Sequence, residues 1–268
     1  MITSLLLLVT SSFVYQIPEN PVEYAVKIIL DGYLPILGGI ENKIKVDLGL
    51  EIRPNEAKED KLQVQYSLKS FDLALKDGES DNFVSMKLPF EDVKEYFPDS
   101  KVTYTKQGKI LATTAPDANM PVQLPGLHSQ HLPDITFLLL QFPEKEIIEN
   151  EKWTYTRKFG DSDVRYEVVY KGKEEKGERF DVELSQSYET LEDLNNNPVS
   201  AREKAEYLVK TTVKGSGVVY FSGLSGVISY AEIRAEANSS VESLKGASEK
   251  PRKLITTFVL EKKTRKMF

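Results

Sequence analysis

The chain contains no cysteine. This absence excludes disulfide bonds, thiolate zinc sites, iron–sulfur clusters and cysteine nucleophiles. It also excludes the acylated cysteine that a bacterial lipoprotein carries at its mature N-terminus. A chain of 268 residues, 40% of them hydrophobic, must therefore be held together by its own core, and its length is sufficient for one.

Histidine is almost absent as well, because the chain holds only His128 and His131. Both lie in the stretch LPGLHSQHLPD, which ends at Asp134. A zinc site needs three or four ligands, and the sequence offers no further histidine and no HExxH motif. We keep His128, His131 and Asp134 as weak candidates for a metal site, and we predict no cofactor and no catalytic residue.

A hydrolase that uses one of these two histidines is the less favoured alternative. The nucleophile motif Gly-x-Ser-x-Gly is missing, since the nearest stretch, Gly223-Leu224-Ser225-Gly226, is one residue short. We therefore favour a protein that is not an enzyme.

An excess of positive charge and a long apolar run are also missing. The formal net charge is -6 and the pI is about 5.3, which argues against nucleic acid as a partner. A transmembrane helix needs about 20 apolar residues. The apolar run from Ile135 to Phe142 has only the length of a strand. We therefore expect no transmembrane anchor.

The N-terminus, MITSLLLLVTSSFVYQ, has the pattern of a signal peptide without its usual basic residues. An apolar core from Leu5 to Val9 precedes the small residues Thr10, Ser11 and Ser12. This pattern predicts a signal peptide within residues 1–16, cleaved after Ser11 or Ser12. It favours an extracytoplasmic protein, either periplasmic or secreted.

Most of the remaining chain shows apolar residues at every second position, which is the pattern of strands with one buried face. It predicts an all-β fold of curved antiparallel sheets, a half-barrel or sandwich, with one short helix from Phe90 to Phe97 that Pro98 ends. The clearest alternating sets are Tyr24, Val26, Ile28 and Leu30; Ile44, Val46, Leu48, Leu50 and Ile52; Trp153, Tyr155, Arg157 and Phe159; and Val164, Tyr166, Val168 and Tyr170.

One strand changes phase along its length. Leu62 to Leu68 places apolar residues at even positions, whereas Phe71 to Leu75 places them at odd positions. A strand cannot change faces without an irregularity, so a β-bulge is predicted near Lys69-Ser70. A bend of this kind lets a sheet curl around a core or a cavity.

The long proline-containing stretch at residues 115–134 divides the chain. We assign residues 17–114 to an N-terminal β-rich half, 115–134 to a connecting loop and 135–268 to a C-terminal β-rich half. The two halves are either similar units or parts of one continuous domain.

Two stretches carry a resemblance to a family of uncharacterised secreted bacterial β-rich proteins. FPEKEIIENEKW resembles a signature with Phe-Pro at the end of a strand and a Trp after the next turn. GSGVVYFSGLSGVISYAEI resembles a second signature at Phe221 and Gly226, although Ser222 stands where the pattern often has Asp. The resemblance implies a fold like the half-barrels of extracytoplasmic lipoprotein carriers, which enclose hydrophobic ligands. It brings no catalytic residues.

The favoured function is therefore a non-enzymatic domain that binds a hydrophobic small molecule or lipid inside a curved sheet. The alternative is a structural or protein-interaction module of the cell envelope, with an envelope protein as partner. The identity of the ligand and the oligomeric state stay open. The candidate apolar lining residues are Leu34, Ile36, Leu37, Phe71, Phe137 and Leu139.

Overall fold

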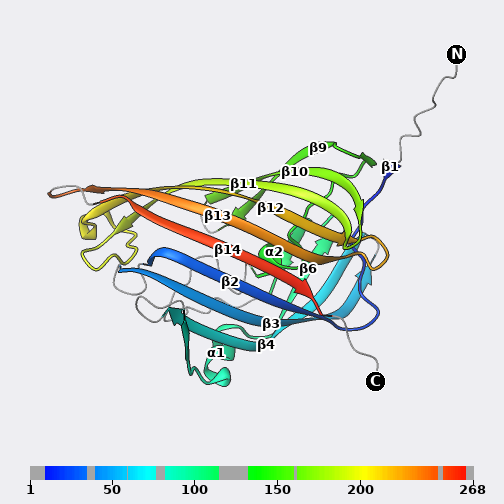
Figure 1. The fold of residues 1–268 in the computed structure, drawn as a ribbon, viewed down its shortest axis with the longest axis horizontal. Helices are drawn as coiled ribbons and strands as arrows, with labels where there is room; N and C mark the ends of the chain where they lie inside the picture. The colour runs from blue at the N-terminus through cyan, green and yellow to red at the C-terminus, as the bar shows by residue number, and fades with distance from the viewer. Residues whose placement is uncertain are drawn as a thin grey trace, which may run out of the picture.

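The computed structural model describes residues 10–34, 40–58, 60–76, 82–114, 132–159, 162–246 and 250–263. Nearly all of its strands belong to one antiparallel sheet of 12 strands that curls without closing into a barrel (Figure 1). The predicted all-β, curved antiparallel fold is thus confirmed. No helix among the described residues is long and apolar enough to span a membrane.

The sheet combines the first and second parts of the chain. From one edge it runs through β7 (Ile110–Thr113), β6 (Ser100–Thr105), β4 (Lys61–Lys76), β3 (Ile40–Lys58) and β2 (Val22–Leu34). It continues through β14 (Arg252–Lys262), β13 (Val227–Ser243), β12 (Tyr207–Ser222), β11 (Gly177–Glu192), β10 (Ser162–Glu174) and β9 (Lys152–Phe159). Because β14 pairs with β2, the two sequence halves share one sheet.

The twelfth strand of the sheet, β5 (Phe83–Met86), pairs with the end of β4 outside this order. The strands β1 (Thr10–Ser11) and β8 (Ile147–Ile148) form a separate two-stranded sheet. The predicted helix is present as α1 (Phe90–Tyr96). In the described part of the chain, further helical turns are α2 (Leu132–Ile135) and the 3₁₀ turn η2 (Arg202–Lys204).

The β-bulge lies where the phase of the sequence changes. Gly49 of β3 lies opposite Ser70 of β4, and the next residue, Leu50, lies opposite Leu68, so Lys69 has no opposite residue. A Cβ atom on Gly49 would lie 2.5 Å from the Ser70 hydroxyl oxygen, which favours glycine there. The extra residue keeps apolar side chains on the concave face on both sides of the bend.

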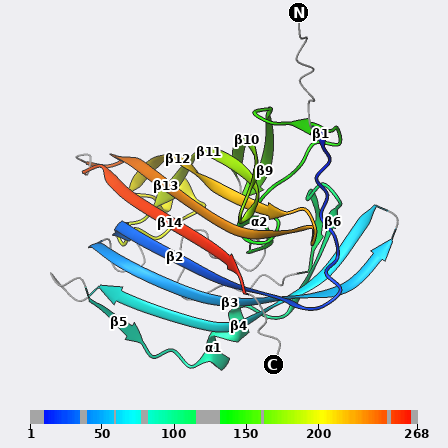
Figure 2. The same cartoon turned by 45° about the vertical axis from the view of Figure 1, so that its right-hand side comes forward.

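The apolar run Ile135 to Phe142, expected to be a strand, contains no strand in the structure. It follows α2 through a turn into an extended segment, and we call Leu132 to Phe142 the plug. Leu132, Leu138 and Leu140 of the plug are almost completely buried. Figure 2 shows α2 between β9–β12 on one side and β2–β4 on the other. Consecutive apolar residues suit this position, because the segment is buried on several sides.

Two side chains of the segment from Ser12 to Ile17 also belong to the core. Phe13 and Tyr15 are buried, and their rings contact a set of aromatic side chains, Tyr104, Phe142, Tyr170, Phe180 and Phe221. The Tyr15 backbone N–H donates to the Lys106 carbonyl at 2.7 Å, and that of Gln16 donates to the Gly226 carbonyl at 3.0 Å. Part of the predicted signal-peptide region, residues 12–16, therefore packs within the folded domain.

Candidate binding face and the plug that fills part of it

The structure separates the predicted site residues. His128, His131, Ile36 and Leu37 lie outside the described residues. Asp134, the third candidate metal ligand, lies in α2 at the start of the plug. Among the described residues, no group of three or more His, Cys, Asp or Glu could hold a metal ion.

The Asp134 carboxylate is bound inside the protein. Arg157 of β9 donates from Nη1 to Asp134 Oδ1 at 3.0 Å, and both side chains are largely buried. Burial raises the pKa of Asp134, and the charge and hydrogen bond of Arg157 oppose this increase. The pair therefore joins the plug to the last strand of the sheet.

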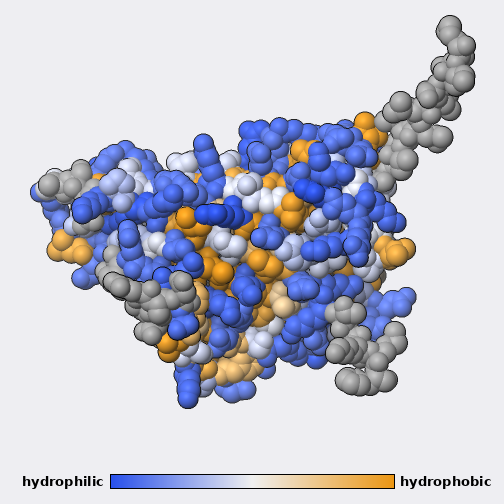
Figure 3. Space-filling view, viewed as in Figure 1, coloured by the Kyte–Doolittle hydropathy of each residue, from blue (hydrophilic) through white to orange (hydrophobic). Residues whose placement is uncertain are grey.

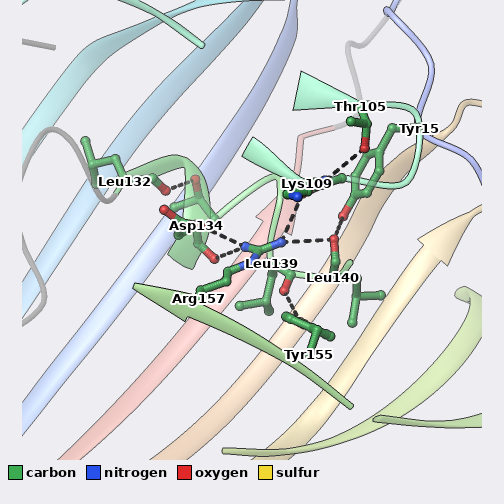
Figure 4. A network of polar contacts seen from close by, with 11 residues as sticks. Tyr15, Thr105, Lys109, Leu132, Asp134, Leu139, Leu140, Tyr155 and Arg157 are labelled. Carbon is green, nitrogen blue, oxygen red and sulfur yellow. Dashed lines mark hydrogen bonds and ion pairs between the residues drawn. The ribbon is translucent and has the colours of Figure 1, made fainter. Parts of the chain in front are cut away.

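The same guanidinium also bonds to backbone carbonyls (Figure 4). Its Nη2 donates to the Gly108 carbonyl at 3.2 Å and to the Leu140 carbonyl at 3.3 Å. Gly108 belongs to the turn between β6 and β7, so one side chain connects β9, the plug and the opposite edge of the sheet. A planar group with five donors is suited to this task.

Two tyrosines complete this network. The Tyr155 hydroxyl donates to the Leu139 carbonyl at 2.7 Å, and the Tyr15 hydroxyl donates to the Leu140 carbonyl at 3.0 Å. The Arg157 guanidinium lies 5.3 Å from the centre of the Tyr155 ring. Burial raises the pKa of both tyrosines above the ordinary value, so both remain donors at neutral pH. The network holds the plug in position.

The role of Arg157 as an internal anchor was not predicted from the sequence. The available signal was its position, since it occupies the same alternating phase as Trp153, Tyr155 and Phe159. A basic residue on the apolar face of a strand must find buried partners, because an isolated buried charge is costly.

The described candidates for the apolar lining occupy two different positions. Phe137 and Leu139 are buried in the plug itself, where Phe137 contacts Tyr66 with ring centres 6.2 Å apart. Leu34 is buried at the end of β2, whereas Phe71 on β4 is partly exposed and packs against Phe97, with ring centres 6.4 Å apart. The plug residues thus fill the concave face instead of lining an empty one.

The space beside the plug is very small. A void of about 10 Å³ lies next to Tyr15, Tyr24 and Phe137. This volume can hold one water molecule at most. A hydrophobic ligand therefore does not fit between the plug and the sheet at this place.

Beyond the plug, two rows of side chains cross the concave face from β5 to β12. They are defined by the pairing of successive strands, and their members are almost all apolar or glycine. The first row is Met86, Leu73, Val46, Ile28, Phe258, Ile233 and Gly217, and the second is Val84, Leu75, Ile44, Leu30, Thr256, Ala235 and Gly215.

Burial changes along these two rows. Val46 and Leu30 in the middle have no exposed surface, whereas Val84 and Met86 at the β5 end are 57% and 41% exposed. Leu88, shortly after β5, is 43% exposed. The rows therefore open to solvent at the β5 edge, where an apolar surface is available.

Comparisons with known proteins bear on the fold. No family model and no curated protein matches the chain. A solved structure described as showing lipid–protein interactions in lipovitellin matches with a TM-score of 0.54 and 15% identity, over 93% of this chain. The chain spans only 25% of that lipovitellin chain.

A protein of unknown function with a hot dog fold from Alicyclobacillus acidocaldarius also matches, with 11% identity over 92% of this chain and 80% of that one. Its TM-score of 0.15 gives no support to any structural argument.

These comparisons define the class of the fold. The chain has a β-rich fold similar to part of lipovitellin, which agrees with the β-rich carrier-like fold that the resemblance implied. They give no support to membership of a secreted bacterial family.

Proposed function

We propose that this protein binds a hydrophobic small molecule, such as the acyl chain of a lipid, on its concave face at the exposed β5 end of the two rows. The observation that carries the proposal is the exposed apolar end of these rows at Val84 and Met86. Apolar side chains that are left exposed together mark binding surfaces more often than isolated ones do. The likeness to lipovitellin supports the proposal at the level of the fold.

The plug and the ligand would occupy different parts of one face. The plug fills the region near Tyr66 and Tyr155, whereas the rows leave it toward β5. Ligand entry at the β5 edge then needs no movement of the plug. We also propose that the protein works outside the cytoplasm, on the basis of its N-terminal sequence, and that it is not an enzyme.

The test is the displacement of a fluorescent fatty acid from the purified protein. The variant Val84→Asp/Met86→Asp places two carboxylates where an acyl chain would enter, and we expect at least about tenfold weaker binding because an unpaired charge beside an apolar ligand costs more than 1.4 kcal/mol.

The matched control is Leu224→Asp, which alters a residue that is 98% exposed in the turn between β12 and β13. This variant should bind the fatty acid like the unaltered protein. Failure of the unaltered protein to bind any fatty acid, or an equal loss in both variants, would refute the proposal. Capture of an envelope protein without lipid would instead favour the protein-interaction module.

A further inference from the structure

A second surface of the protein, on the convex face, is hollowed and charged. A trough of about 640 Å³ lies over β10 to β13. Its side chains alternate with those of the concave face: in β10, Val164, Tyr166 and Val168 are buried, whereas Arg165 between them is exposed. In Figure 3 the surface over β12 and β13 is mostly blue and white, and orange residues gather over β14 and β2.

Strand pairing explains the shape of the trough. Arg165 lies opposite Ser185, and Ser185 lies opposite Lys214. Two residues further along β12, Ser216 lies opposite Arg234 of β13. The two serines are short, so the three long basic side chains surround a shallow polar floor.

The basic groups of the trough are not neutralised by ion pairs. Among the described residues, Arg165, Lys214 and Arg234 form no ion pair within 4.0 Å, although all three line the trough. Two acidic residues of the trough are paired with lysines, Glu167 with Lys152 and Glu236 with Lys253 at 2.8 Å.

The remaining acid, Glu183, lies opposite Glu167 on one side and Ser216 on the other. The lining itself carries three basic and three acidic side chains, and the hydrogen bond from Lys253, with a smaller contribution from the charge of Arg234, lowers the pKa of Glu236. With the paired Lys152 and Lys253 included, five basic groups lie among three carboxylates, so the trough and its border carry an excess of two positive charges although the chain carries a net charge of -6. A positive hollow in an acidic protein attracts anions, and guanidinium groups bind phosphate oxygens through two parallel hydrogen bonds.

We propose that this trough binds a phosphate group, which belongs either to a soluble phosphate ester or to the headgroup of a phospholipid. The charged side chains of the site are on the opposite face from the apolar rows, of which only Gly215 and Ala235 also border the trough. The site does not depend on the hydrophobic ligand. Arg165, Lys214 and Arg234 hold the anion, Ser185 and Ser216 donate hydrogen bonds from the floor, and Glu183 opposes binding.

The experiment measures dissociation constants for glycerol phosphate by calorimetry, and for phosphatidylcholine vesicles with and without phosphatidate by co-sedimentation. Lys214→Gln and Arg234→Gln should each weaken binding about tenfold, because each removes a charge-assisted hydrogen bond. Glu183→Gln should strengthen binding, because it removes the opposing charge. The matched control, Lys210→Gln, alters an exposed lysine of the same strand that pairs with Glu242 outside the trough, and it should have no effect.

The two ligands separate the sources of the phosphate. Binding of glycerol phosphate with this pattern identifies a soluble ester, and binding of phosphatidate vesicles alone identifies a lipid headgroup; both support the proposal. Three outcomes overturn it: binding of neither ligand, an equal effect of Lys210→Gln and Lys214→Gln, or weaker binding in Glu183→Gln. Lys214→Gln should bind the fluorescent fatty acid as the unaltered protein does. The proposal for the phosphate site can therefore fail without the proposal for the hydrophobic ligand, and the reverse also holds.

Discussion

Replacement of Arg157 by methionine tests whether the buried network holds the plug. The change keeps an unbranched side chain of moderate length and removes the charge. It leaves the Asp134 carboxylate, 3.0 Å from Arg157 in the structure, without its partner, and it removes donors to the Gly108 and Leu140 carbonyls. Breaking one side of a buried ion pair typically costs about 3–5 kcal/mol, so we expect a loss of this size in the free energy of unfolding at pH 7.

The assay is urea unfolding followed by the fluorescence of Trp153, whose indole N–H donates to the Gln141 carbonyl of the plug at 2.8 Å. Arg165→Met makes the same chemical change at an exposed position of the next strand, where we expect a change within about 0.5 kcal/mol. The double variant Arg157→Met/Asp134→Leu should be more stable than Arg157→Met, because it no longer buries an unpaired charge.

The cost of Arg157→Met should also depend on pH. Burial raises the pKa of Asp134 even with Arg157 present, so the folded protein binds a proton on this group more readily than the unfolded chain does. The penalty of the charged carboxylate is therefore fully present above the folded-state pKa and is lost as the pH falls through it. A loss below 1 kcal/mol at pH 7, or a cost that grows on acidification, would refute the reasoning.

Two further predictions concern the N-terminal segment and the bulge. Phe13→Ala removes a buried ring that contacts Phe142 and Phe180 and should destabilise the fold by about 3–5 kcal/mol in urea unfolding; a loss under 1 kcal/mol would show that this segment is dispensable. Burial alone would raise the pKa of Glu51, but hydrogen bonds from Lys69 and Arg53 hold it below its usual range. The ionised Glu51 therefore stabilises the fold above the unfolded-state pKa, and this stabilisation is lost as the pH falls through the folded-state pKa. Glu51→Gln should be less stable at neutral pH, and its free energy of unfolding should change less with pH on the acid side. An unchanged dependence of stability on pH would contradict this.

The strands and their faces could be predicted from the sequence because both depend on local alternation. Ile44 to Ile52 alternates, and its even positions are buried in β3. The bulge near Lys69 was predicted for the same reason, since a change of phase must be absorbed within a few residues.

The strand order and the plug could not be predicted, because they depend on contacts between distant segments. Nothing local indicates that β14 pairs with β2, residues more than two hundred positions apart. The run Ile135 to Phe142 has the composition of a strand, yet it lies inside the curled sheet without pairing. The role of Arg157 likewise appears only when Asp134, Gly108 and Leu140 are brought around it.

The open sheet explains why so many segments meet at one turn. Its outer strands β7 and β9 do not pair with each other, so other hydrogen bonds connect the two edges of the sheet. The carbonyls of residues 106–108 receive hydrogen bonds from the Tyr15 backbone, the Phe142 backbone and the Arg157 side chain. The N-terminal segment, the plug and β9 thus converge on the β6–β7 turn and fix the curvature of the sheet at this end. The rows that reach β5 take no part in these contacts, and their apolar end at the β5 edge stays exposed.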